Sequence, residues 1–208
     1  MVILYVETNF LMAIAKGQDL EAENLLCSLP PSIQIVIPDF CYVEALNRWE
    51  TEKYYVQEFE KNIDKQINNS KRDLTSSNAQ IFLAHLEQAR IWNQLLLNDI
   101  QIRLFNAIDM LLQKAEVINL NNIIIRNISQ AVITQPETLL IKQDIMDNLI
   151  LQCILHHANL YHRENKVFLS DKSKDFGKPE IRNILHNSGI KYLNNTQKFL
   201  DWLNSQNT

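Results

Sequence analysis

The chain has 208 residues, of which 46% are hydrophobic and 21% charged, and its formal net charge is −4. This composition is ordinary for a globular domain with a sizeable core. The three glycines form no glycine-rich phosphate-binding motif, which excludes P-loop and dinucleotide-binding sites. The negative net charge argues against a strongly basic nucleic-acid binder, although local basic patches stay compatible with it.

The three cysteines, Cys27, Cys41 and Cys153, are far apart and odd in number. Such cysteines are typical of buried thiols in a reducing compartment, and no Cys-x-x-Cys pair supports a zinc site. The first apolar run has no basic segment before it and ends at Glu7, so it resembles neither a signal peptide nor a membrane span. We therefore expect a cytoplasmic protein that does not associate with a membrane.

The first predicted strand is the apolar run from Val2 to Val6, which is followed by Glu7, Thr8 and Asn9. A short apolar run bounded by polar residues indicates a strand buried on both faces, as in a parallel sheet covered by helices. A carboxylate at the carboxyl end of such a strand stands where open α/β sheets bind their ligands. The alternative is that these polar residues only cap the next helix.

The next segments predict a helix, a strand and a second helix. Residues 10–29 have helical spacing with a weak stop near Gly17, and residues 33–38 are rich in β-branched side chains, which is typical of a strand. Asp39 is a good N-cap for the helix that follows, and Glu44 lies just over one turn into it. This order is typical of an α/β domain.

Residues 50–114 predict a long helical hairpin inserted into that domain. A polar loop at 68–78 separates two helical stretches, and the Ser77-x-x-Gln80 pattern predicts a capping box for the second stretch. We expect the aromatic residues Trp49, Tyr54, Tyr55 and Trp92 to pack in the interior rather than to stack on bases. The second stretch has one apolar stripe: Phe82, Leu86, Ala89, Trp92, Leu96, Ile100, Leu104, Ile108 and Leu111.

The remaining segments alternate again between strands and helices. The predicted elements are a strand at 115–120, a helix at 123–133, a helix from Asp144, a strand at 166–169, a helix at 179–187, a strand at 190–193 and a helix capped by Thr196. Alternation of this kind predicts an α/β fold with a central parallel sheet of about four or five strands flanked by helices. We expect residues 1–208 to form one domain, with residues 50–114 as a helical insertion.

Four acidic residues, Glu7, Glu44, Asp147 and Asp171, follow strands or begin helices in this scheme; we call them the acidic quartet. The carboxyl ends of parallel strands meet at one edge of the sheet, so these carboxylates are expected to converge and to repel one another unless a cation neutralises them. No lysine or arginine stands next to Glu7, Glu44 or Asp147 in the sequence. Oxygen ligands suit Mg²⁺ or Mn²⁺, and we expect such a metal here.

The segments around the quartet resemble the four motifs of PIN-domain nucleases. They are residues 6–11, 38–44, 147–150 and 168–171 with Asp175 and Phe176, and the tail at 189–193 is also similar. The resemblance implies that the quartet binds Mg²⁺ or Mn²⁺ and that Asn9 and Ser170 orient the carboxylates or the attacking water. It also implies hydrolysis of an RNA substrate by water. A toxin–antitoxin setting would add an antitoxin-like protein partner, and the helical hairpin would frame a substrate channel or form a homodimer.

Several positions keep a second interpretation. Glu7 replaces the aspartate usual in the family, and the extra methylene displaces its carboxylate, which would weaken the site. Asp144 can be a further ligand or the N-cap of the helix that carries Asp147. Asp175 can be an accessory ligand or part of the turn before Gly177, and the loop 172–174 can contact phosphate or simply be solvated.

Two other functions compete with the nuclease. A catalytically weakened PIN-like module that binds RNA or protein is favoured by the glutamate at position 7 and by the acidic net charge. A phosphatase or nucleotide-handling enzyme on a doubly wound sheet is disfavoured, because no Asp-x-Asp motif follows the first strand and no glycine-rich loop occurs.

Overall fold

The computed structural model describes residues 1–142 and 144–206. The elements in chain order are β1 (Val2–Tyr5), α1 (Thr8–Ala15), α2 (Leu20–Cys27), β2 (Ile33–Pro38), α3 (Phe40–Ser70), α4 (Ser77–Lys114), β3 (Glu116–Ile118), α5 (Asn122–Thr134), a 3₁₀ turn (Pro136–Thr138), α6 (Ile145–Ala158), β4 (Asn165–Leu169), α7 (Pro179–Asn187), β5 (Ile190–Leu193) and α8 (Thr196–Ser205). None of the described helices is long and apolar enough to cross a membrane.

The five strands form one parallel sheet in the order β3-β2-β1-β4-β5. The α/β fold with a parallel sheet flanked by helices is therefore confirmed. After β1 the chain proceeds toward one edge of the sheet, and after β4 it proceeds toward the other edge. The carboxyl ends of β1 and β4 consequently flank the point where the topology reverses, which is where open α/β sheets form a crevice for ligands.

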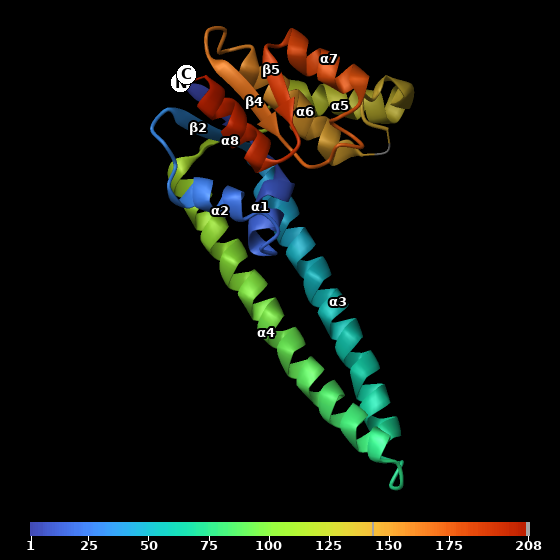
Figure 1. Cartoon of the computed structure of the whole chain (residues 1–208). Helices are drawn as coiled ribbons and strands as arrows, with labels where there is room; N and C mark the ends of the chain where they lie inside the picture. Colours follow the sequence, from blue (N-terminus) through green and yellow to red (C-terminus); the bar gives the residue numbers. More distant parts are fainter. Residues whose placement is uncertain (143, 207–208) are drawn as a thin grey trace.

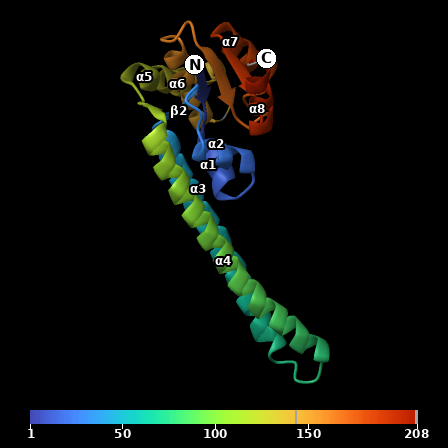
Figure 2. The same ribbon diagram turned by 60° about the vertical axis from the view of Figure 1, so that its left-hand side comes forward.

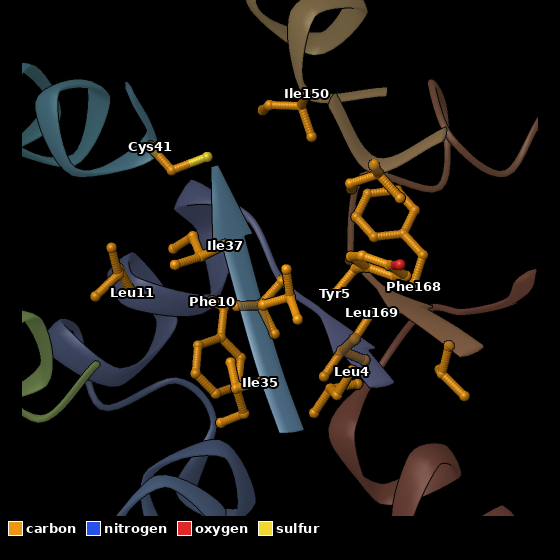
Figure 3. Close-up of a cluster of buried hydrophobic side chains, with 14 of the residues drawn as sticks. Leu4, Tyr5, Phe10, Leu11, Ile35, Ile37, Cys41, Ile150, Phe168 and Leu169 are labelled. Carbon is orange, nitrogen blue, oxygen red and sulfur yellow. The ribbon is translucent and has the colours of Figure 1, made fainter. Parts of the chain in front are cut away.

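Burial on both faces explains why the central strands are apolar along their whole length. All four residues of β1 are buried, and the neighbouring strands contribute Ile35, Ile37, Phe168 and Leu169 to the same core (Figure 3). Right-handed crossovers place α1 to α4 on one face and α5 to α7 on the other. Helix α8 contacts α2, β4 and β5, so it covers the first face beyond α2 (Figure 1).

Helices α3 and α4 form an arm that projects far from the sheet (Figures 1 and 2). The predicted hairpin is present, but its first helix is continuous from Phe40, directly after β2, rather than beginning near residue 50. Arg90 forms an ion pair with Asp64 at 3.2 Å, and the Asn93 amide donates to the Val56 carbonyl at 3.4 Å. The first turns of α3 thus stand at the carboxyl edge of the sheet, while its remaining length pairs with α4.

The expectation that the aromatic residues pack in the interior agrees with Trp49, which is partly buried against the core, but it is wrong for the other three. Tyr54, Tyr55 and Trp92 are each more than half exposed, as is Leu96 of the predicted apolar stripe. Beyond their contacts with α1 and α2, the two helices pack against each other and bury one side of each. On α4, Asn93 contacts α3, and Leu97 is partly buried. The arm therefore leaves considerable apolar surface in solvent.

Several element ends differ from the prediction by a few residues. The N-cap of α4 is Ser76 rather than Ser77, and Asn195 rather than Thr196 caps α8, whereas the Asp39 cap of α3 is confirmed. The predicted helix at 10–29 is divided into α1 and α2 at Gly17, whose φ of 65° lies in the left-handed region that glycine adopts readily.

A buried polar cluster links β1, β3 and α6. The Tyr5 hydroxyl lies 3.0 Å from His157 Nδ1, and His157 Nε2 lies 3.1 Å from the Glu116 carboxylate. Tyr5 is fully buried and His157 nearly so. The imidazole thus has a partner at each nitrogen, which is what a buried histidine requires.

We expect Tyr5→Phe to lower the free energy of unfolding by about 1–3 kcal/mol, because it leaves a buried ring nitrogen of His157 without its partner. Tyr42→Phe is the matched control. The Tyr42 hydroxyl is buried and has no hydrogen-bond partner among the described residues, so its removal should be neutral or stabilising. Urea unfolding at pH 7 measures both changes, and equal losses would contradict the role given to the Tyr5 hydroxyl.

Candidate active site

Glu7 lies at the crevice between β1 and β4 and is fully buried. It is the N-cap of α1, because one carboxylate oxygen accepts the Asn9 backbone N–H at 2.8 Å. The other oxygen accepts the Ser170 hydroxyl at 2.9 Å. The capping interpretation is therefore correct, and it coexists with a position at the edge of the sheet where ligands bind.

Burial raises the pKa of Glu7 to about 7. The Asn9 N–H, the nearby charge of Lys172 and the Ser170 hydroxyl all favour the ionised form, but together they do not offset the desolvation. The charge of Asp147 raises the pKa further. This carboxyl therefore sits in a site that needs positive charge in order to stay ionised near neutral pH.

Asp147 reaches the same crevice from the first turn of α6. Asp144 caps this helix by accepting the Asp147 backbone N–H at 2.8 Å, as the N-cap interpretation predicted. Asn148, also buried, donates to the carbonyls of Ile141 and Asp144 at 2.6 and 2.7 Å and accepts the Ile141 N–H. These bonds hold the start of α6 against the preceding segment and set the position of Asp147.

The Asp147 carboxylate is buried and only half satisfied. One oxygen accepts a hydrogen bond from Lys172 Nζ at 2.5 Å, while Oδ2 is buried without a hydrogen-bond partner among the described residues. Burial raises the pKa of Asp147, although the Lys172 ammonium opposes the shift. A buried unpartnered carboxylate oxygen is unusual in a folded protein and points to a missing ligand.

Lys172 follows β4 by three residues, and its ammonium lies among the carboxylates. Burial by itself would lower the pKa of Lys172, but the hydrogen bond that its ammonium donates to Asp147 and the charges of Glu7, Asp147 and Glu44 raise it above its ordinary value. The expectation that no basic side chain neutralises the quartet is therefore wrong. A lysine distant in sequence does so through the tertiary structure.

Glu44 is held by a second basic residue. Arg48 Nη2 and Nε donate to one Glu44 oxygen at 2.8 and 3.2 Å, and the Thr8 hydroxyl donates to the other. Arg48 Nη1 also donates to the Asn9 side-chain carbonyl at 2.7 Å. Glu44 therefore faces the crevice with its charge already paired.

Asp171 is exposed and lies at the mouth of the site rather than inside it. Its carboxylate accepts the Asn9 side-chain amide at 2.6 Å. Asn9 thus connects Asp171 on one side with Arg48 on the other, so it orients two charged groups at once. The accessory role expected for Asn9 remains a prediction, but it has the contacts that such a role requires.

Asp175 belongs to the turn before α7. It pairs with Lys178 at 3.5 Å, and its backbone N–H donates to the Lys172 carbonyl. Gly177 completes the turn, where a Cβ atom would come within 2.3 Å of the Ser173 carbonyl oxygen. The contacts of Asp175 therefore agree with the turn interpretation.

The residues present fit a divalent ion that has few protein ligands. In the part of the chain that the structure describes, no group of three or more acidic, histidine or cysteine side chains is arranged to hold a metal. Mg²⁺, however, is usually held by one or two carboxylates and keeps several waters. Glu7 and Asp147, with the unpartnered Asp147 Oδ2, supply two such carboxylates.

Thr8 and Arg48 of this site were not among the predicted site residues, and Lys172 was predicted only as part of a loop that contacts phosphate or is solvated. Arg48 lies four residues after Glu44 on the same helix, a spacing that by itself indicates an ion pair. Thr8 directly follows Glu7 and was considered only as a cap. Lys172 could not be paired with Asp147 from local spacing, because 25 residues separate them.

The raised pKa of Glu7 predicts a pH-dependent stability in the metal-free protein. Between the ordinary value of 4.5 and about 7, the folded state binds more protons than the unfolded state, so stability falls as the pH rises through this window. Relative to Glu7→Gln, the wild type should lose up to about 3 kcal/mol of unfolding free energy between pH 5 and pH 8. Urea unfolding with a chelator present measures this difference, and parallel pH profiles of the two proteins would contradict it.

Comparison with known proteins identifies the family. A family model described as a PIN domain matches residues 4–176, which includes the end of β1, all of β4 and all four members of the acidic quartet. No curated protein and no solved structure matches the chain. PIN domains are generally nucleases. The matched region contains the crevice and the carboxylates described above, and the chain belongs to the PIN-domain family.

Proposed function

We propose that the protein is a metal-dependent ribonuclease that hydrolyses phosphodiester bonds at the crevice between β1 and β4. The observation that carries this proposal is the Asp147 carboxylate, which is buried with one oxygen unpartnered beside the equally buried Glu7. Membership of a nuclease family gives this chemistry its substrate class. Glu7 and Asp147 would hold Mg²⁺ or Mn²⁺, and Glu44 and Asp171 would complete the site.

The residues of the chain have separate roles in this proposal. A bound divalent ion supplies positive charge and lowers the pKa of water, which suits phosphodiester hydrolysis. Ser170 and the Asn9 N–H hold the Glu7 carboxylate in place, and Asp144 fixes the position of Asp147. Arg48, which is partly exposed, can offer its guanidinium to a phosphate once it leaves Glu44.

Two small cavities, one lined by Asn9 and one by its partner Arg48, suit an RNA strand in this proposal. One, of about 210 Å³, is lined mainly by polar side chains, including Gln18, Asp171 and Asn194. The other, of about 220 Å³, is lined by Lys16, Arg48 and Glu52. A strand laid across Asn9 would pass both cavities and the mouth of the crevice.

A binding module with weakened catalysis is the second candidate, and one observation favours it. The three basic residues around the crevice are paired with carboxylates: Lys16 with Glu52, Arg48 with Glu44 and Lys172 with Asp147. Carboxylates that are already paired with basic side chains depend less on a bound metal ion for neutralisation than four unpaired carboxylates would. Glutamate in place of the usual aspartate at position 7 also favours the binding module, because the longer side chain would weaken a metal site.

The expected partners other than RNA remain part of the proposal. These are an antitoxin-like protein that would cover the crevice and a second copy of the chain. Family membership is compatible with both but distinguishes neither. A cytoplasmic location is likewise an expectation from the sequence.

The test is cleavage of labelled single-stranded RNAs with Mn²⁺ and with chelator. We expect metal-dependent cleavage by the wild type and a loss of roughly 100-fold or more in rate for Asp147→Asn, because one of two buried ligands is changed. Asp201→Asn on α8 is the matched control, since Asp201 pairs with Gln197 outside the crevice. Its rate should equal that of the wild type.

Asp171→Asn gives a further distinction, because the exposed Asp171 contacts only the mouth of the crevice through Asn9. A loss smaller than that of Asp147→Asn would agree with this position. If no RNA is cleaved by folded wild-type protein with metal, while filter binding detects RNA, the binding module replaces the nuclease.

A further inference from the structure

We propose that Lys172 is an internal counter-cation of the carboxylate site and competes with a divalent ion for Asp147. This inference rests on the proposed metal site at Glu7 and Asp147. The Lys172 ammonium contacts Asp147 at 2.5 Å, and the side chains are only 14% and 1% exposed. The pair is therefore a shielded contact rather than one of the weak surface pairs common on proteins.

The charges around Lys172 explain why it occupies this position. Glu7, Glu44 and Asp147 each act on its ammonium, which makes it the common neighbour of three carboxylates. Arg48 pairs with Glu44, so Lys172 is the cation that remains for the two buried carboxylates. A divalent ion at Glu7 and Asp147 would bind the same Asp147 carboxylate, through the unpartnered Oδ2, and its charge would repel the ammonium that contacts Oδ1.

The loop that carries Lys172 allows the side chain to leave without unfolding. The Lys172 backbone N–H donates to the Ser170 hydroxyl at 3.2 Å, and the Lys172 carbonyl accepts N–H groups from Asp175 and Phe176. The backbone is thus anchored, whereas the side chain is a point charge on a flexible four-carbon stem. Displacement by a metal requires only rotation of that stem.

If Lys172 competes with the metal, the affinity for the metal depends on the fraction of molecules in which the Lys172 ammonium does not contact Asp147. The apparent dissociation constant of a ligand increases as the competent fraction of the protein falls. If the ammonium occupies the site more than about nine-tenths of the time, removing it should tighten metal binding by ~10-fold or more. The same ammonium keeps the buried carboxylates compensated when no metal is bound.

The first experiment titrates Mn²⁺ into the wild type, Lys172→Gln and Lys174→Gln, with free Mn²⁺ measured by electron paramagnetic resonance. Lys174 lies in the same loop, is exposed and makes none of the contacts described above, so it is the matched control. We expect Lys172→Gln to bind Mn²⁺ at least ~10-fold more tightly than the other two proteins. Equal affinities, or no binding by any of the three, would overturn the proposal.

The second experiment uses the wild type alone and so does not depend on the folding of a variant. Acetylation of lysines is followed by mass spectrometry at increasing Mn²⁺. Release of Lys172 from its shielded contact should increase its labelling several-fold, while the labelling of Lys174 stays constant. Unchanged labelling of Lys172 at Mn²⁺ concentrations that saturate the protein would overturn the proposal. Both measurements are independent of RNA cleavage, so a failed cleavage assay leaves their interpretation intact.

We further infer that the outer side of α4 binds a second copy of the chain. This inference stands on a different observation, a second apolar seam along the arm. Its members are 47% to 70% exposed: Ile81, Ile91, Leu95, Ile102, Phe105 and Leu112. The buried side of α4 is formed by other residues, among them Leu104, Ala107 and Leu111, and two seam members, Ile102 and Phe105, also line an open cavity of about 350 Å³ with Leu46 and Trp49 of α3.

The spacing of the outer seam suits helix pairing. From Ile91 to Leu112, with Asn98 and Asp109 filling two places, the steps alternate between four and three residues, which is the heptad pattern of coiled coils. The apolar residues are also nearly symmetric about Asn98, to within one residue. Leu95 and Ile102 stand three and four residues from it, and Ile91 and Phe105 stand seven residues from it on either side.

This symmetry favours a second copy over an unrelated partner. In an antiparallel pair with a two-fold axis at Asn98, Leu95 of each copy meets Ile102 of the other, and Ile91 meets Phe105. The exposed area agrees with such a pair. The chain exposes 12185 Å², whereas a compact monomer of 24.3 kDa would expose about 10,000 Å². The excess is comparable to the area that a stable dimer interface buries.

Sedimentation equilibrium at micromolar concentration tests the dimer. We expect the wild type to be dimeric and Ile102→Lys to be monomeric, whereas Ile133→Lys on α5, an even more exposed isoleucine outside the arm, should stay dimeric. In a Cys27→Ser background, Asn98→Cys should form an intermolecular disulfide on mild oxidation and Ser77→Cys at the arm's tip should not. A monomeric wild type, or a dimer that survives Ile102→Lys without the Asn98→Cys cross-link, would overturn this proposal.

Discussion

The site depends on the cost of burying two carboxylates side by side. Glu7 is fully buried because it ends β1 and caps α1, and Asp147 is buried because α6 begins where the crevice opens. An isolated ionised carboxylate in such a place is strongly disfavoured, so the chain must protonate it or supply a cation. The raised pKa of Glu7 and the ammonium of Lys172 are two expressions of this one constraint.

The same constraint relates the family to the individual chain. PIN domains bring acidic side chains to the carboxyl edge of a parallel sheet, and this chain keeps that arrangement. Two of its four carboxylates, however, are paired with basic residues, and a third is exposed and held by Asn9. Under our proposal, the difference between a nuclease and a binding module lies in whether a divalent ion or Lys172 neutralises Asp147.

The arm is connected to this site by one continuous helix. Helix α3 contributes Glu44 and Arg48 in its first turns and then extends along α4 away from the sheet (Figure 1). An event at the arm, such as pairing with another copy, would act on the helix that positions Glu44. The α3–α4 hairpin thus carries the apolar seam on α4 and, at the start of α3, two residues of the charged crevice.

The sequence by itself determined the features that depend on neighbouring residues. The buried strands, the Asp39 and Asp144 caps, the long helices and the position of Glu7 after β1 follow from local periodicity and capping chemistry. Only the tertiary structure decided which side chains meet. Asn9 reaches Asp171 across 162 residues, Lys172 reaches Asp147, and Trp92 faces solvent because the arm has no sheet beneath it. Side-chain pairing across distant elements depends on how those elements pack, and no local pattern records that packing.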